Sequence, residues 1–146
     1  MFHAIRNFLL RMADAGRSEA DMSIVRFRAN RQQLQDEFFR LASSSGKPRG
    51  LIWTNCDWQS EFALVKDSST GLLTAYSAVH VSFAAVEGGE MEGVDAVSAI
   101  REGSAVFHYQ NGQWGTGGGL LFNMSPKLAA QRVGDGHEVL RIVDLE

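Results

Sequence analysis

Apolar residues recur every three or four positions along the first third of the chain, which is the spacing of one face of an α-helix. This pattern predicts a short helix through residues 2–12 and a longer helix over residues 19–42. Gly16 is expected to end the first helix, and Ser18 to open the second. The apolar face of the first helix consists of Phe2, Ile5, Phe8, Leu9 and Met12.

The longer helix carries the strongest periodic signal, a seam of alternating three- and four-residue steps that Arg31 interrupts. Three heptads are too few to predict a coiled coil, so we expect the seam to pack within the chain, on the sheet or on the first helix. Pairing of two seams in a structural homodimer is the alternative. The apolar residues of the seam are Ile24, Phe27, Leu34, Phe38 and Leu41.

After a linker over residues 45–49, apolar and polar residues alternate with a period of two, which is typical of strands that bury one face. Short helices are expected near residues 94–101, before Gly103, and over residues 126–133, where Ser125 caps a helix that begins with proline. The predicted strands cover residues 51–55, 61–66, 72–86, 105–110, 113–122 and 138–145, with a hairpin loop over residues 67–71.

These elements predict a single α+β domain over residues 1–146, with N-terminal helices packed on a mainly antiparallel sheet of about five to six strands. Residues 1–44 form the helical segment, and residues 50–146 the sheet-rich segment. A chain of 146 residues is long enough to bury a core without disulfide bonds.

The clearest turn is Asn111-Gly112, because both residues accept the positive φ angles of a two-residue type I′ hairpin. Such a turn pairs His108 with Gly115 and Val106 with Gly117. One face of this hairpin then carries core residues. The opposite face carries Ser104, Val106 and His108 beside Gly115, Gly117 and Gly119.

Alternate glycines weaken a strand, so something is expected to lie close to this backbone. A packed helix or a tryptophan, Trp53 or Trp58, would cover the glycines for structural reasons. Alternatively, a flat ligand or a partner's backbone would lie on them in a shallow groove with His108 at its edge. A bulge that bends the strand is the third explanation. The candidate ligand-binding residues are His108, Gly115, Gly117, Gly119, Trp53 and Trp58.

Composition limits the class of protein but does not indicate a function. Charged residues make up 21% of the chain and hydrophobic residues 45%, which is typical of a globular domain. Cys56 is the single cysteine, so no disulfide forms within the chain and a cytoplasmic location is expected. Apolar runs are far shorter than the ~20 residues of a membrane helix, so no membrane association is expected.

Charge is divided unevenly, with a net +4 over residues 1–49 and −7 over residues 50–146. The simplest interpretation is a basic helix packed beside an acidic sheet. Nucleic-acid binding is not expected, because the arginines form no dense stripe and the whole chain carries a net charge of −3.

Cys56, His80 and His108 are the weak catalytic candidates, because a cysteine nucleophile needs a nearby base to hold it as a thiolate. Their pocket would be walled by Trp53, Trp58 and Tyr76. The four histidines follow no zinc-binding spacing, so neither a metal nor a cofactor is predicted.

No motif specifies a reaction. The expected function is therefore a small non-catalytic ligand-binding or protein-interaction domain with an exposed apolar or aromatic patch. The alternatives are a small enzyme that uses Cys56, His108 or both, and a structural homodimer through the seam of residues 24–41.

Overall fold

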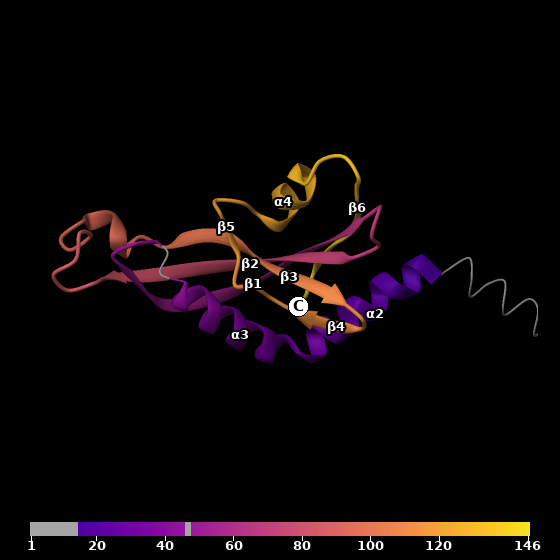
Figure 1. Cartoon of the computed structure of the whole chain (residues 1–146), viewed down its shortest axis with the longest axis horizontal. Coiled ribbons are helices and arrows are strands. Elements are labelled where there is room, and N and C mark those ends of the chain that lie inside the picture. The colour runs from indigo at the N-terminus through magenta and orange to yellow at the C-terminus, as the bar shows by residue number, and fades with distance from the viewer. Residues whose placement is uncertain (1–14, 46–47) are drawn as a thin grey trace, which may run out of the picture.

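Figure 1 shows the computed structural model of the chain, in which residues 15–45 and 48–146 are described. Helices α2 (Ala15–Ala29) and α3 (Arg31–Ser44) come first. The predicted helix through residues 2–12 lies outside the described residues. The later elements are β1 (Leu51–Asp67), β2 (Leu73–Ala85), the 3-10 helix η1 (Asp95–Ser98), β3 (Arg101–Gln110), β4 (Gln113–Gly115), β5 (Leu120–Phe122), α4 (Pro126–Arg132) and β6 (His137–Asp144).

All strand pairs are antiparallel, and the sheet runs in the order β4-β3-β2-β1-β6. Strand β5 pairs with β3 as well, farther along the edge that β4 occupies. The described residues therefore form three α-helices and a six-stranded antiparallel sheet, which confirms the predicted α+β class.

The sequence predicts two strands, over residues 51–55 and 61–66, where the structure has the single long strand β1. Register shifts between Trp58 and Phe62 place a bulge where the sequence is polar. The carbonyl oxygens of this bulge are bound from elsewhere in the chain. Arg31 Nη2 donates to Gln59 at 3.1 Å, and the backbone N–H of Leu145 donates to Ser60 at 2.8 Å.

The predicted helix over residues 19–42 is wrong in two respects, and the first is that the structure divides it at Asn30. The backbone of Asn30 (φ −108°, ψ 12°) is not helical, and its side-chain Nδ2 donates to the carbonyl of Arg26 at 2.9 Å. Helix α2 also begins earlier than predicted, at Ala15, and runs through Gly16. The break precedes Arg31, the polar residue in the seam, which turns its guanidinium to the bulge of β1.

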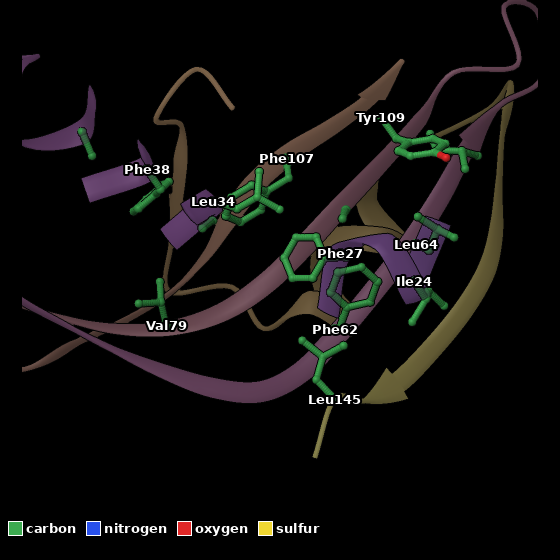
Figure 2. Close-up of a cluster of buried hydrophobic side chains, with 14 of the residues drawn as sticks. Ile24, Phe27, Leu34, Phe38, Phe62, Leu64, Val79, Phe107, Tyr109 and Leu145 are labelled. Atoms are coloured by element: carbon green, nitrogen blue, oxygen red, sulfur yellow. The ribbon is translucent and has the colours of Figure 1, made fainter. Parts of the chain in front are cut away.

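The seam packs on one face of the sheet, which confirms the prediction that it is used within the chain (Figure 2). Phe27 lies at the centre, 4.8 Å from the ring of Phe62 and 5.2 Å from that of Phe107. Ile24, Phe27, Leu34 and Phe38 are buried and Leu41 is half-buried, so the seam offers a second copy almost no exposed surface.

Helix α4 lies over the other face of the sheet (Figure 1), and a smaller core lies beneath it. Ala129 and Ala130 of α4 pack against Ala63, Val65 and Tyr76. The predicted helix start is confirmed, since Pro126 opens α4 and Ser125 Oγ accepts from the backbone N–H of Leu128. We call the two faces the α2/α3 face and the α4 face.

Strand β1 begins, and β2 ends, at the end of the sheet where residues 86–100 connect β2 to β3; we call it the η1 end. The helix predicted near residues 94–101 is present only as η1, and Gly103 lies inside β3 instead of ending a helix. None of the helices in the described part of the chain is long and apolar enough to cross a lipid bilayer.

Candidate functional sites

The Asn-Gly hairpin forms as predicted. Asn111 (φ 54°) and Gly112 (φ 77°) make the turn, and His108 pairs with Gly115. Beyond Gly115 the predicted register is wrong. The backbone N–H of Val106 donates to Gly119, not to Gly117, and the Val106 carbonyl accepts from Thr116 Oγ1 at 2.7 Å. The predicted strand over residues 113–122 is therefore split into β4 and β5.

The structure also shows how open the backbone of these glycines is. A Cβ atom on Gly115 or Gly117 would meet nothing within 4 Å, so no helix or tryptophan among residues 15–45 and 48–146 covers them. On Gly119 it would touch only Val106, at 3.9 Å. Of the three explanations, cover by a helix or a tryptophan is not found among the described residues, and a ligand lying on the open glycines stays a prediction. The glycine that packs closely is Gly118 (φ +79°), whose Cβ would lie 2.8 Å from the backbone nitrogen of Ala42.

The predicted ligand-binding residues lie on opposite faces of the sheet. Trp53 and Trp58 belong to the α2/α3 face, where both rings contact Phe38. His108 points to the α4 face and is exposed, with Nδ1 3.4 Å from Thr74 Oγ1. The structure therefore does not bring the tryptophans together with His108.

The catalytic candidates are separated in the same way. Cys56 pairs with Val81 and faces α3, whereas His80 and His108 face the α4 side. Burial raises the pKa of the Cys56 thiol to about 11, so the thiol is protonated at neutral pH. Tyr76, a predicted wall of the pocket, is buried in the α4-side core, and burial raises its pKa as well. Neither His80 nor His108 is therefore placed to act as a base for Cys56.

His80 lines a small hollow of about 230 Å³ beside α4, and its Nε2 lies 3.7 Å from Glu102 Oε1. Cys56 borders a second, open hollow of about 350 Å³ between α3 and β1. No group of three or more histidine, cysteine or acidic residues that could hold a metal occurs among the described residues.

A larger hollow, about 520 Å³, lies between the bend at Asn30 and the β3–β4 hairpin. Its charged groups already have partners within the chain. Arg26 Nη1 donates to Tyr109 OH at 2.7 Å and to the Gly112 carbonyl at 3.1 Å. Glu37 accepts from Arg40, and this hydrogen bond lowers the pKa of Glu37. The hollow thus offers mostly amide groups, without a spare charge to select a ligand.

A different kind of hollow, about 310 Å³, lies at the η1 end of the sheet, and we call it the η1 groove. Phe83 and Val97 form its buried floor, and Phe122 stands at its side with the ring 6.3 Å from that of Phe83. Arg101 is the one ionisable residue among the described residues that line it. The lining residues are Pro48, Leu51, Phe83, Met91, Val97, Arg101, Phe122 and Asn123.

Exposed aliphatic side chains surround this end of the sheet. Ile52 follows the first residue of β1, Val86 follows β2, and Ile100 precedes β3. Ile100 is 67% exposed and Ile52 53%, far more than is usual for isoleucine. Val94 is also exposed. The η1 end therefore carries exposed aliphatic side chains outside the groove lining, and Ile52, between Leu51 and Trp53 in β1, lies on the α4 face.

Sequence patterns alone did not reveal the η1 groove, because its lining comes from separate segments of the chain. One signal was present. Val94, Val97 and Ile100 step by three and predict a helix with a buried apolar face, but only Val97 is buried. Apolar residues within this acidic connection therefore indicate an exposed apolar surface rather than a buried helix face.

Comparison of the chain with protein-family models, with curated proteins and with solved structures finds no match. What the chain does is therefore inferred from its own surface.

Proposed function

We propose that this chain is a non-catalytic protein-interaction domain that binds a short, basic, amphipathic segment of another protein in the η1 groove. The observation that supports this most is the apolar groove itself, with Phe122 39% exposed at its side, because exposed apolar patches mark interaction sites.

The chemistry of the lining favours binding over catalysis. The groove floor of Phe83 and Val97 offers apolar contact, and Arg101 and Asn123 are its only polar lining residues within the described chain. At about 310 Å³ the groove is at the lower end of the range for small-molecule sites. It suits a few apolar side chains of a peptide rather than an enclosed substrate.

The charge of the connection beside the groove argues for a basic partner, whereas the groove lining itself contributes one cation, Arg101. Residues 86–100 contain no lysine or arginine. They contain four carboxylates, at Glu87, Glu90, Glu92 and Asp95. A partner that carries lysine or arginine beside its apolar face gains long-range attraction from these groups, and an acidic partner is repelled.

A binding measurement with two synthetic peptides tests the proposal. The probe is an amphipathic peptide of about 15 leucine and lysine residues, and its control has glutamate in place of each lysine. We expect only the lysine peptide to bind, with weaker affinity at about 0.15 M than at about 0.02 M salt. Isothermal titration calorimetry reports both affinities.

Surface variants then locate the site. Phe122→Lys and Met91→Lys each remove an apolar side chain from the groove lining and add a repelling charge, so each should weaken binding about tenfold. Leu72→Lys is the matched control, because Leu72 is 43% exposed and lies at the opposite end of the sheet. The proposal is overturned if the lysine peptide does not bind, or if the three variants bind it equally well.

A further inference from the structure

Independently of the η1 groove, the outer edge of β6 is a surface suited to a second copy of this chain. Strand β6 is last in the sheet order and pairs with β1 on its inner side, while no other described element pairs with it. It is eight residues long, whereas β4 and β5 at the other edge have three residues each. An edge of this length offers backbone donors and acceptors to another strand, and the Leu140 and Asp144 carbonyls already accept from the side chains of Arg141 and Arg28.

Exposed aliphatic side chains flank this edge on the α4 face. Val139 is 42% exposed and Ile142 45%. They pair with Val65 and Ala63 of β1, which both belong to the core under α4, so Val139 and Ile142 share that face.

Helix α2 adds an apolar residue on the opposite face. Asp21 accepts from Arg141 Nη2 at 3.3 Å, and Arg28 Nη2 donates to the Asp144 carbonyl at 3.3 Å. Val25 lies between these two contacts on the same stripe of the helix, one turn from each, and is 56% exposed. Aliphatic side chains therefore border the edge of β6 on both faces.

We propose that two copies of the chain pair their β6 strands antiparallel about a two-fold axis between Leu140 and Arg141, which joins the two sheets into one. In this register, Val139 faces Ile142 of the second copy, and His137 faces Asp144. Glu138 then faces Val143, and Leu140 faces Arg141. None of these four pairs places like charges opposite each other.

The bulge in β6 selects this register. Residues opposite each other in an antiparallel pair must lie on the same face of the sheet, but in a regular strand Val139 and Ile142 would lie on opposite faces. In β6, Val139 pairs with Val65 and Arg141 with Leu64, so Leu140 is an extra residue. This extra residue returns Val139 and Ile142 to one face.

The extra residue in β6 also places both members of each outer pair on the same face of the sheet. Glu138 and Val143 pair with Lys66 and Phe62 of β1, which lie on the α2/α3 face. His137 and Asp144 pair with Asp67 and Glu61 of β1. Asp67 and Glu61 are the direct neighbours of Lys66 and Phe62 in the strand, so they and their partners lie on the α4 face. Bulges often protect an edge from pairing. Here the bulge allows one register of self-pairing in which every pair of opposite residues shares a face of the sheet.

Two charge variants of the full chain test this pairing by analytical ultracentrifugation. The first carries Val139→Glu and Ile142→Glu, and the second carries Val139→Lys and Ile142→Lys. We expect the wild type to sediment as a dimer, and each variant alone to raise the dimer Kd on the order of 100-fold through like-charge repulsion. An equimolar mixture should restore the dimer mass, because glutamate then faces lysine at both positions.

Leu72→Glu serves as the matched control and should keep the wild-type mass. Far-ultraviolet circular dichroism confirms that each variant is folded before sedimentation. A wild type that is monomeric at all accessible concentrations overturns the proposal, and so do variants that remain dimeric alone. If both variants are monomers and their mixture stays monomeric, the register is wrong. None of these results depends on whether a peptide binds at the η1 groove.

Discussion

The indole Nε1 of Trp114 donates a hydrogen bond of 2.7 Å to the carbonyl oxygen of Ser23, which joins the short edge strand β4 to helix α2. The ring of Trp114 also packs edge-on against Phe27 at 5.3 Å. Through these two contacts a three-residue strand is held to the main core. The hairpin is thus fixed both by its turn and by α2.

Trp114→Phe should lower the free energy of unfolding by about 1–2 kcal/mol, because phenylalanine keeps part of the ring contact and loses the donor. Urea denaturation followed by circular dichroism measures this change. Gln113→Ala, at an exposed position on the same strand, is the control and should stay within about 0.5 kcal/mol. An equal effect of the two substitutions would show that the hydrogen bond contributes nothing.

The faces of this hairpin could be predicted because two independent local signals agree. Asn111-Gly112 fixes the turn, and alternation assigns Phe107 and Tyr109 to the core. The break of the long helix could not be predicted in this way. Asn30 lies in a helical pattern, and the bend there accompanies a contact between Arg31 and the carbonyl of Gln59, which is distant in sequence.

The candidate sites also divide into features that a local sequence pattern predicts and features that depend on contacts between distant segments. Sequence spacing drew attention to Gly115, Gly117 and Gly119, because alternation is a local property. The η1 groove depends on Leu51, Phe83 and Phe122 meeting in three dimensions, and no local pattern reports such a meeting. Cys56 and the histidines were grouped by chemistry alone, and strand alternation with the bulges of β1 places them on different faces.

Asp67 makes the β1–β2 hairpin sensitive to acid. Its Oδ1 accepts from Ser69 Oγ at 2.7 Å, from the Ser69 N–H at 2.9 Å and from the Thr70 N–H at 3.1 Å. The Ser69 hydroxyl, followed by the two backbone N–H groups, lowers the pKa of Asp67 to about 2. The unfolded state therefore binds more protons between about pH 4 and pH 2, and this part of the stability is lost as the pH falls through that window.

Asp67→Asn removes the charge and the titration. We expect it to destabilise the protein at pH 6, and the difference from the wild type to shrink as the pH is lowered from 4 to about 2. Thermal unfolding at a series of pH values measures the difference. Asp135→Asn, at another exposed acidic position, is the control. A constant difference at all pH values would contradict the assignment.

Cys56 should react slowly while the protein is folded. With its pKa raised by burial to about 11, its thiolate fraction at pH 8 is on the order of 100-fold below that of a free thiol of pKa about 8.5. We expect iodoacetamide to modify Cys56 slowly in buffer and rapidly in urea. Fast modification of the folded chain would contradict this and would revive Cys56 as a nucleophile.

Gly118 is where the loop between β4 and β5 touches helix α3, and it should tolerate substitution least. Its φ of +79° disfavours any L side chain, and a Cβ there would lie 2.8 Å from both the Ala42 nitrogen and Leu41 Cβ. Gly118→Ala should therefore lower the free energy of unfolding by about 2 kcal/mol or more.

Gly117→Ala is the matched control for Gly118→Ala, one position earlier in the same loop. Nothing lies within 4 Å of its added methyl group, and its φ is not positive, so alanine should change stability by no more than about 0.5 kcal/mol. Urea denaturation of the two variants separates the possibilities. If Gly117→Ala costs as much as Gly118→Ala, then a neighbour that lies outside the described contacts covers the glycines. If only Gly118→Ala is costly, the contact with α3 is what requires glycine in this loop.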